Sequence, residues 1–240
     1  METPAGGAPG AGAAFFDLDK TLIARSSTLA FAPTFYQNGL ISRVQAVRGG
    51  LAQLLFRIGG ADHQRMERIR EQITSLCQGW PADRVTEIVT ANLVKTIGPI
   101  VYAEAQGLLL AHRAAGRDVI IVSTAGQEMV GPIGAMLGAS SVIATRMRLA
   151  DGRYTGEMEF YAYGEAKARK MRELAVERGY ALEECFAYSD SVTDLPMLEA
   201  VGYPHAVNPD RELRRIARDR GWPVLAFVER ALMACEPQNQ

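Results

Sequence analysis

The stretch Phe15-Phe16-Asp17-Leu18-Asp19-Lys20-Thr21-Leu22 decides the fold of this 240-residue chain. An apolar pair leads into two aspartates that are separated by a single residue. Because side chains alternate along a strand, Asp17 and Asp19 project to one side and Leu18 to the other. Two neighbouring carboxylates repel each other unless a cation lies between them, so the pair suits a nucleophile, a proton donor and a bound Mg²⁺. The plainer interpretation is an aspartate-rich turn after a short strand.

Composition narrows the class of protein. The apolar fraction of 48% supports a large core. The sequence contains no run of about 18 apolar residues, so no membrane span is predicted. The near-zero formal charge gives no indication of a nucleic-acid partner. The arginines between residues 211 and 220 are interrupted by Glu212 and Asp219, which favours a solvated helix face over a nucleic-acid-binding patch. Residues 1–14 are rich in Gly, Ala and Pro, which predicts a disordered lead-in. The three scattered cysteines form neither a disulfide framework nor a zinc pattern, which fits a cytoplasmic protein.

Residues 25–98 are predicted to be helical, with no strand between the helices. Ser26 and Ser27 can cap a helix that runs to Gln37, and Pro33 lies inside it. Further helices are predicted from Ser42 to about residue 59, from residue 62, and from Pro81 to about residue 96. Gly98-Pro99 then breaks the pattern. We therefore expect this block to be an inserted all-helical cap.

After residue 98 the pattern alternates between strands and helices. Strands are expected at 118–123, 185–188, 203–207 and 224–227, and a hairpin at 142–148 and 154–159 turns at Asp151-Gly152. Helices are expected at 102–115, 127–137, 165–178, 195–201 and 211–219. This order predicts an α/β fold with an open parallel sheet, built from residues 15–24 and 99–240. Ligands bind beyond the carboxyl ends of such strands, where Asp17, Ser123 and Asp190 are expected to lie.

Three further motifs follow the predicted strands in order: Val122-Ser123-Thr124, Gly164-Glu165-Ala166-Lys167 and Ser189-Asp190-Ser191-Val192-Thr193-Asp194. Together with Asp17-Leu18-Asp19-Lys20-Thr21, this constellation resembles the haloacid dehalogenase (HAD) superfamily, and within it the phosphoserine phosphatase-like branch, subfamily IB. The resemblance covers residues 15–227. It implies a HAD-like (Rossmannoid) parallel sheet with a helical C1 cap, and a phosphatase that uses Mg²⁺ and an aspartyl-phosphate intermediate.

The resemblance also implies a role for each motif residue. Asp17 would attack phosphorus, and Asp19 would protonate the leaving oxygen and later activate water. Lys167 would neutralise the attacking carboxylate, and Asp194 would orient Lys167. The phosphoryl group would be bound by Asp17, Thr21, Ser123, Thr124 and Lys167, and Mg²⁺ by Asp17, the Asp19 carbonyl and Asp190.

Three positions depart from the pattern of phosphoserine phosphatases. Ser26 stands where those enzymes have a glutamate that holds the substrate's amino group. Thr124-Ala125 replaces a glycine pair, and Thr193 replaces an asparagine. The first two changes remove amino-acid recognition, so we expect a small phosphorylated metabolite as substrate, with phosphoserine as one candidate rather than the preferred one.

Other functions compete with this one. A dehalogenase would use Asp17 on carbon without a metal, which leaves the other aspartates unexplained, and the missing apolar spans disfavour a P-type ATPase. A regulatory domain that binds phosphate or Mg²⁺ without turnover is the non-enzymatic alternative. His63, His112 and His205 are expected to be too dispersed to ligate one metal. Arg43, Arg48 and Arg57 are candidates for contacting the substrate's far end, and we expect a monomer or a homodimer.

Overall fold

The computed structural model describes residues 12–41 and 74–231 of the chain. The predicted lead-in lies mostly outside these residues. So do the helix predicted from Ser42, the start of the next helix, the three candidate arginines at 43, 48 and 57, and His63.

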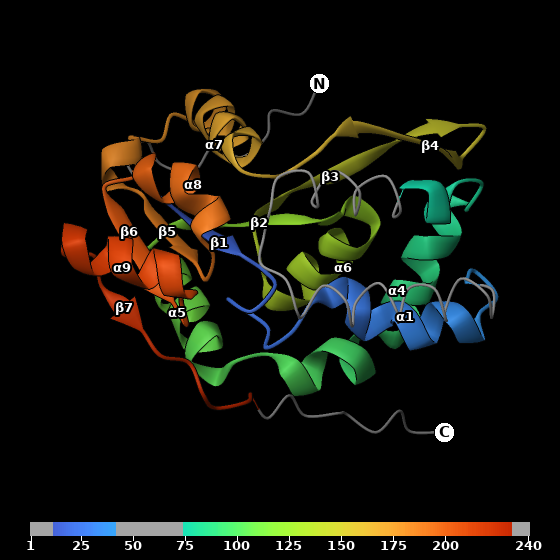
Figure 1. Ribbon diagram of the computed structural model, residues 1–240, viewed down its shortest axis with the longest axis horizontal. Coiled ribbons are helices and arrows are strands. Elements are labelled where there is room, and N and C mark those ends of the chain that lie inside the picture. Colours follow the sequence, from blue (N-terminus) through green and yellow to red (C-terminus); the bar gives the residue numbers. More distant parts are fainter. Residues whose placement is uncertain (1–11, 42–73, 232–240) are drawn as a thin grey trace.

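In the described part of the chain, seven strands form one sheet in the order β4-β3-β2-β1-β5-β6-β7 (Figure 1). All neighbours pair in parallel except β3 and β4, which form an antiparallel hairpin. The predicted parallel α/β sheet is thus confirmed, with β1 at its centre. The strands are β1 (Ala13–Asp17), β2 (Asp118–Gly126), β3 (Ser141–Ala150), β4 (Arg153–Phe160), β5 (Phe186–Ser189), β6 (Tyr203–Val207) and β7 (Val224–Leu225).

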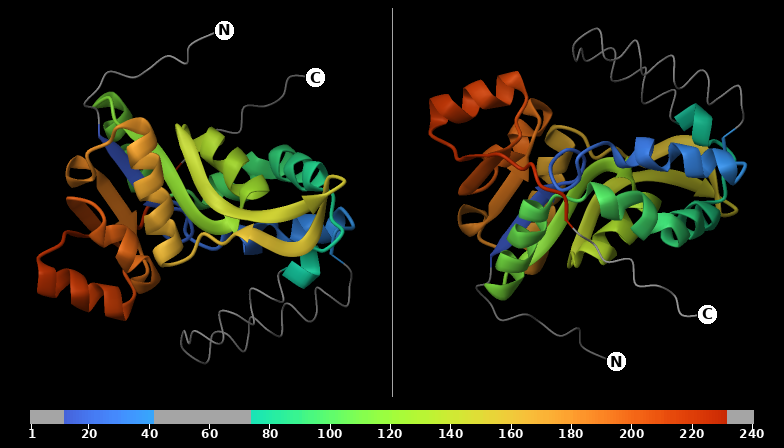
Figure 2. Two further views of the ribbon diagram at one scale, coloured as in Figure 1. Left: turned by 90° about the horizontal axis from the view of Figure 1, so that it is seen from above. Right: turned by 90° about the horizontal axis from the view of Figure 1, so that it is seen from below.

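Helices cover both faces of the sheet, as the two further views make clear (Figure 2). Side chains of β1 alternate between the faces: Phe15 packs with buried residues of α7, α8 and α9, whereas Phe16 packs with those of α1, α4, α5 and α6. The first group is α7 (Glu165–Arg178), α8 (Leu195–Glu199) and α9 (Arg211–Arg220); the second is α1 (Ser27–Gln37), α4 (Ala82–Ile97), α5 (Ala103–Ala114) and α6 (Gln127–Leu137). Short 3₁₀ turns occur at η1 (Gly98–Ile100), η2 (Leu182–Glu184) and η3 (Val192–Asp194).

Most boundaries agree with the sequence prediction to within two residues. The helices predicted at 127–137 and 165–178 and the strand at 203–207 match α6, α7 and β6. The hairpin turns at Asp151 and Gly152, whose φ angles of 50° and 72° are those of a two-residue turn with both residues left-handed. The main difference is β2, which continues three residues past the predicted end at Ser123, with irregular pairing between Ser123 and Gly126.

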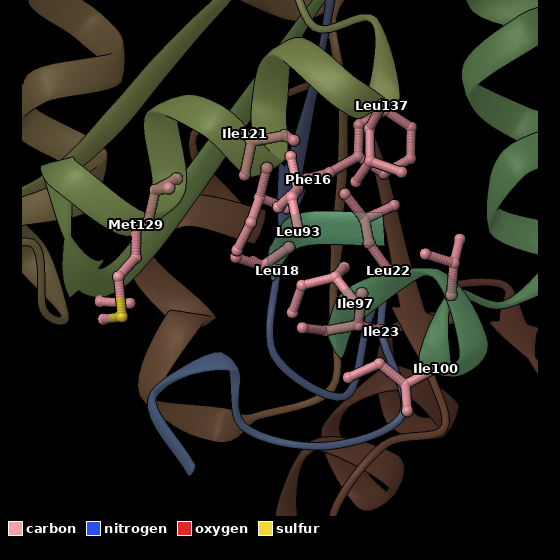
Figure 3. Packing of buried hydrophobic residues seen from close by; sticks show 14 of the residues in the cluster. Phe16, Leu18, Leu22, Ile23, Leu93, Ile97, Ile100, Ile121, Met129 and Leu137 are labelled. Carbon is pink, nitrogen blue, oxygen red and sulfur yellow. The ribbon is translucent and has the colours of Figure 1, made fainter. Parts of the chain in front are cut away.

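Helix α4, which was predicted to be part of the cap, packs against α6 and α1. Leu93 and Ile97 of this helix belong to the same buried cluster as Phe16, Leu18 and Ile121 (Figure 3). The chain just before α4 also pairs with the hairpin, since the Tyr154 N–H donates to the Trp80 carbonyl at 3.0 Å. The predicted division at residue 98 therefore crosses a continuous core, and the extent of the cap stays a prediction.

None of the helices in residues 12–41 and 74–231 is long and apolar enough to cross a membrane.

Two glycines make a matched test of the packing. A Cβ at Gly202 would lie 1.8 Å from the carbonyl oxygen of Glu183, whereas a Cβ at Gly107 in α5 would meet nothing within 4 Å. We expect Gly202→Ala to lower the free energy of unfolding by roughly 2 kcal/mol or more, because the backbone must move. Gly107→Ala should raise it by about 0.5–1 kcal/mol through helix propensity. Urea unfolding of both variants measures this difference, and equal stabilities would contradict the close approach at Gly202.

His112 and His205 lie closer together than the sequence suggested, because both rings contact Tyr188. His112 is 5% exposed, and its Nε2 lies 2.8 Å from the Tyr188 hydroxyl. Burial, aided by Arg117 and His205, lowers the pKa of His112 from 6.5 to about 4. His112 is therefore an uncharged core side chain at neutral pH.

This lowered pKa predicts a loss of stability in acid. Between pH 6.5 and 4 the unfolded chain binds a proton at His112 that the folded chain does not, so the free energy of unfolding falls as the pH falls. At pH 5 the loss from this group should be about 1–2 kcal/mol. In His112→Gln, the difference in unfolding free energy between pH 7.5 and pH 5 should be smaller by that amount. Urea titrations at both pH values give the comparison, and identical differences in the two proteins would refute it.

Candidate active site

The carboxyl ends of β2, β1 and β5 lie side by side at one edge of the sheet. Asp17, the last residue of β1, pairs with Val122 of β2, so Ser123 lies one step beyond it. The residue before Asp17 pairs with Tyr188 of β5, so Asp190 follows two steps further along that neighbouring strand. The structure thus brings the end of β1 next to two strand ends that lie more than 100 residues later in the sequence.

A tight turn follows β1. The backbone N–H groups of Leu22 and Ile23 both donate to the Leu18 carbonyl, at 3.0 and 3.1 Å. Lys20 has a φ of 67°, a left-handed conformation that is uncommon outside glycine and is concentrated at functional sites. Thr21 is fully buried in this turn, and its hydroxyl has no hydrogen-bond partner among the described residues. A buried hydroxyl without a partner is suited to receive a bound ligand.

Lys167 is a buried cation at this edge of the sheet. It lies in the first turn of α7, and only 2% of it is exposed. Its Nζ donates to Asp17 Oδ1 at 2.7 Å and to the Asp194 carboxylate at 2.9 Å. Burial alone would lower the pKa of Lys167, but these two carboxylates more than offset it and hold the pKa above its ordinary value. Lys167 therefore stays charged and joins the end of β1 to the loop after β5.

Asp194 is held from a second side by Ser189. The Ser189 hydroxyl donates to Asp194 Oδ2 at 2.8 Å and accepts the backbone N–H of Ser191 at 3.2 Å. Both Ser189 and Asp194 are buried. The predicted position of Asp194, in contact with Lys167, is therefore what the structure shows.

Asp210 supports the loop that carries Asp190. Its carboxylate accepts the backbone N–H groups of Val192 and Leu213, each at 2.8 Å, and thereby also caps the N-terminus of α9. The Asp210 N–H donates to the Asp190 carbonyl at 2.8 Å. This loop is thus fastened to the start of α9.

Ser123 and Thr124 lie in the irregular end of β2. Ser123 is 2% exposed, and its hydroxyl oxygen accepts the Ala125 N–H at 3.2 Å. The Thr124 hydroxyl donates to the Ala162 carbonyl at 3.0 Å. Its proton is therefore already engaged, so a contact of Thr124 with a phosphoryl group would have to use its backbone N–H.

Asp19 is oriented by the first helix of the predicted cap. Its Oδ1 accepts the backbone N–H of Ser27, the first residue of α1, at 2.9 Å. Burial raises the pKa of Asp19, and hydrogen bonds from the start of α1 oppose this rise. Because Oδ1 is an acceptor, a proton on this carboxyl group would sit on Oδ2.

Carboxylates outnumber cations here in the described part of the chain. Burial raises the pKa of Asp17 well above its ordinary value and that of Asp190 to about 7; Asp194 adds to both rises. Lys167 opposes the rise at Asp17, and Lys20 opposes it at Asp190. A further cation would relieve this repulsion.

A magnesium ion fits this set of ligands. No three His, Cys, Asp or Glu side chains converge to hold a metal within residues 12–41 and 74–231. Mg²⁺ does not require them, because it is commonly bound by one or two carboxylates together with phosphate oxygens and water. Asp17, Asp190 and the backbone carbonyl of Asp19 could supply the protein ligands, as the sequence predicted.

Three side chains of this region were given no role by sequence reasoning: Ser189, Thr145 and Asp210. Thr145 lies in β3 and donates its hydroxyl to the Thr124 carbonyl at 2.7 Å. Ser189 stands within the last motif, directly before Asp190, so its place next to the site could have been anticipated. Neither Thr145 nor Asp210 lies in a recognised motif, and only the folded chain places them here.

Curated relatives of this chain include several phosphatases. A probable phosphatase of Mycobacterium tuberculosis is 55% identical over 227 residues, which are 94% of this chain and 79% of the relative. A phosphoserine phosphatase of the same organism is 32% identical over 222 residues, 90% of this chain and 70% of the relative. A histidinol-phosphatase of Neisseria meningitidis is 29% identical over 220 residues, 89% of this chain and 98% of the relative.

Solved structures share the fold. A Bordetella pertussis protein of unknown function is 30% identical, with a TM-score of 0.77 over 89% of this chain and 97% of that chain. A phospho-aspartyl intermediate analogue of phosphoserine phosphatase is 20% identical, with a TM-score of 0.64 over 92% of this chain and 95% of that chain. At this lower identity the similarity concerns the fold.

The family model of haloacid dehalogenase-like hydrolases matches residues 14–199, a range that contains the turn after β1, the buried Lys167 and the loop after β5. The described site and the relatives agree with this match. The chain belongs to the haloacid dehalogenase-like hydrolases and is a phosphatase of that family.

Proposed function

We propose that this phosphatase hydrolyses a small phosphomonoester through an aspartyl-phosphate on Asp17, with Mg²⁺ as cofactor. The observation that carries the proposal is the buried Lys167 ammonium, which contacts Asp17 at 2.7 Å and Asp194 at 2.9 Å beyond the carboxyl ends of the central strands. A charged lysine that is hydrogen-bonded to a carboxylate offsets the repulsion when that carboxylate approaches an anion such as a phosphoryl group.

The first step joins Asp17 to phosphorus. An oxygen of the Asp17 carboxylate attacks in line, the bond between phosphorus and the leaving oxygen breaks, and Asp17 becomes an acyl phosphate. Lys167 neutralises part of the negative charge that Asp17 and the phosphoryl oxygens would otherwise bring together. Ser123 and the Thr21 hydroxyl are the remaining groups that we assign to those oxygens.

Asp19 transfers the proton in both steps. Since its Oδ1 is held by the Ser27 N–H, the proton is donated from Oδ2 to the leaving oxygen. In the second step a water molecule attacks phosphorus, Asp19 takes a proton from that water, and Asp17 and inorganic phosphate are released. Asp19 thus ends the cycle in the protonated form in which it began.

Asp17, the Asp19 carbonyl and Asp190 are the residues that we propose to hold Mg²⁺. When bound, the ion supplies positive charge that offsets the repulsion between these carboxylates and the substrate phosphate. Asp194 keeps Lys167 in place next to this charge, and Ser189 in turn keeps Asp194 in place.

The substrate is not decided by sequence similarity. Two relatives at comparable identity, 32% and 29%, are named for different substrates, phosphoserine and histidinol phosphate. Ser26 precedes α1 and offers no carboxylate for an amino group. We propose a phosphorylated metabolite that is not selected as an amino acid. The free thiols of Cys77 and Cys185 support a cytoplasmic location for the protein.

The nucleophile is tested by Asp17→Asn. Removing the attacking carboxylate should lower Mg²⁺-dependent phosphate release at least about 1,000-fold, because the amide cannot form the acyl phosphate. Asp151→Asn is the matched control, since Asp151 is exposed in the hairpin turn and asparagine tolerates its left-handed backbone. This control should retain wild-type rates. Release of phosphate is measured with an aryl phosphate, with Mg²⁺ and with excess chelator.

Unchanged turnover in Asp17→Asn would refute the aspartyl-phosphate mechanism. Full activity in the presence of chelator would refute the Mg²⁺ requirement. A wild-type chain that binds phosphate yet releases none from any monoester would favour the regulatory alternative.

Substrate preference is tested with a panel at equal concentrations. We expect the aryl phosphate to be hydrolysed, and phosphoserine to be no better a substrate than glycerol phosphate or histidinol phosphate. The reason is that neither Ser26 nor Thr124 provides a carboxylate for an amino group. A value of kcat/KM for phosphoserine about tenfold above the other alkyl phosphates, roughly 1.4 kcal/mol of discrimination, would show that amino-acid recognition is present.

A further inference from the structure

The end of β2 bulges away from β3 directly after Ser123. Ser123 pairs with Ala144 and Gly126 pairs with Thr145, so the two residues between them have no pairing partner on β3. Bulges re-aim side chains and are common beside active sites. This bulge has a chemical consequence, because the backbone carbonyl of Thr124 leaves the ladder of the sheet and needs another donor.

The donor is the side chain of Thr145. Its hydroxyl donates to the Thr124 carbonyl at 2.7 Å and accepts the backbone N–H of Ala162 at 3.2 Å. The Thr124 hydroxyl donates in turn to the Ala162 carbonyl at 3.0 Å. These three hydrogen bonds form a closed circuit that we call the threonine clamp, made of Thr124, Thr145 and Ala162.

The clamp is largely shielded from water, although Thr124 itself is half-buried. Thr145 is 4% exposed and Ala162 is fully buried. A buried carbonyl or N–H without a partner costs about 1–3 kcal/mol, so the circuit resists opening. The two joined segments are otherwise separate, since one is the end of β2 and the other is the connection between β4 and α7.

Each joined segment carries a residue of the proposed active site. Ser123 immediately precedes Thr124 in the bulge. On the other side, the chain runs from Ala162 through Gly164 into α7, and the Lys167 N–H donates to the Gly164 carbonyl at 3.1 Å. Gly164 has a φ of 53°, so the turn into the helix is tight. The clamp is therefore a short mechanical connection between Ser123 and Lys167.

We propose that Thr145 is a positioning residue of this phosphatase. Its hydroxyl holds the Ser123 segment and the Lys167 segment at a fixed separation, so that both can contact one phosphoryl group. The proposal rests on the function proposed above. It also implies that the loss caused by breaking the clamp is independent of the leaving group, because both segments act on the phosphoryl part of the substrate.

The test replaces the hydroxyl by a methyl group of similar shape. Thr145→Val should lower kcat by about tenfold or more, since misplacing reacting groups by 1 Å can cost up to about 100-fold. The loss should be the same for an aryl and an alkyl phosphate. Thr145→Ser keeps the hydroxyl and should restore most of the rate. Thr155→Val is the matched control, because Thr155 lies on the same hairpin and its hydroxyl contacts only exposed backbone and the Glu157 N–H in the described structure.

Binding of inorganic phosphate separates this inference from the proposed function. In the presence of Mg²⁺, calorimetry should show a dissociation constant at least about fivefold higher for Thr145→Val than for wild type, because two anion-binding groups are misplaced. If wild type releases no phosphate from any ester, the proposed function fails while this binding difference still supports the positioning role. A wild-type chain that neither turns over nor binds phosphate overturns both.

A purely structural role gives a different result. In that case Thr145→Val would unfold at a lower temperature, but its kcat and phosphate affinity well below that temperature would equal those of wild type, which overturns the inference. If Thr145→Val does not fold, Thr124→Val breaks only the bond to the Ala162 carbonyl. It should give a smaller loss of kcat in the same direction, and no loss in that variant would also overturn the inference.

Discussion

A buried ammonium group between two buried carboxylates constrains the whole site. A charge inside a protein must be paired and hydrogen-bonded, because an unpaired one costs several kcal/mol. Lys167 meets this condition only where the end of β1, the start of α7 and the loop after β5 come together on Asp17 and Asp194. The requirement to compensate one lysine therefore fixes the relative position of three segments that are distant in the sequence.

The sheet makes this meeting possible. β1 is central and is flanked on both sides by parallel partners, so three carboxyl ends lie at one edge. Its side chains alternate between two apolar layers, and that leaves polar residues to the strand ends. The same geometry places Asp190 beside Asp17 and leaves excess negative charge there. This excess is the physical reason to expect a divalent cation, and it does not depend on any similarity to other proteins.

Rigidity around the site comes from polar side chains that satisfy irregular backbone. Asp210 fastens the loop of Asp190, Ser189 fastens Asp194, and Thr145 fastens the bulge after Ser123. Asp19 differs from these, because it is held by the backbone of α1, the first helix of the predicted cap. Asp19, the proposed proton-transfer group, is thus hydrogen-bonded to the start of α1, whereas Asp17, the proposed nucleophile, ends β1 and Lys167 lies in α7. A substrate bound between them would contact both parts.

The sequence by itself determined the class of fold and the motif residues, because apolar periodicity, turn chemistry and the order of acidic motifs are local features. Helices 127–137 and 165–178 and the Asp151-Gly152 turn followed from such patterns. Only the tertiary structure decided the end of β2, the engagement of the Thr124 hydroxyl, and the roles of Thr145 and Asp210. The reason is that these depend on hydrogen bonds between residues that pairing in the sheet brings together, and no local pattern in the chain encodes such partners. The packing of α4 against α6 belongs to the same group, since the apolar face of α4 is visible in the sequence but its partner is not.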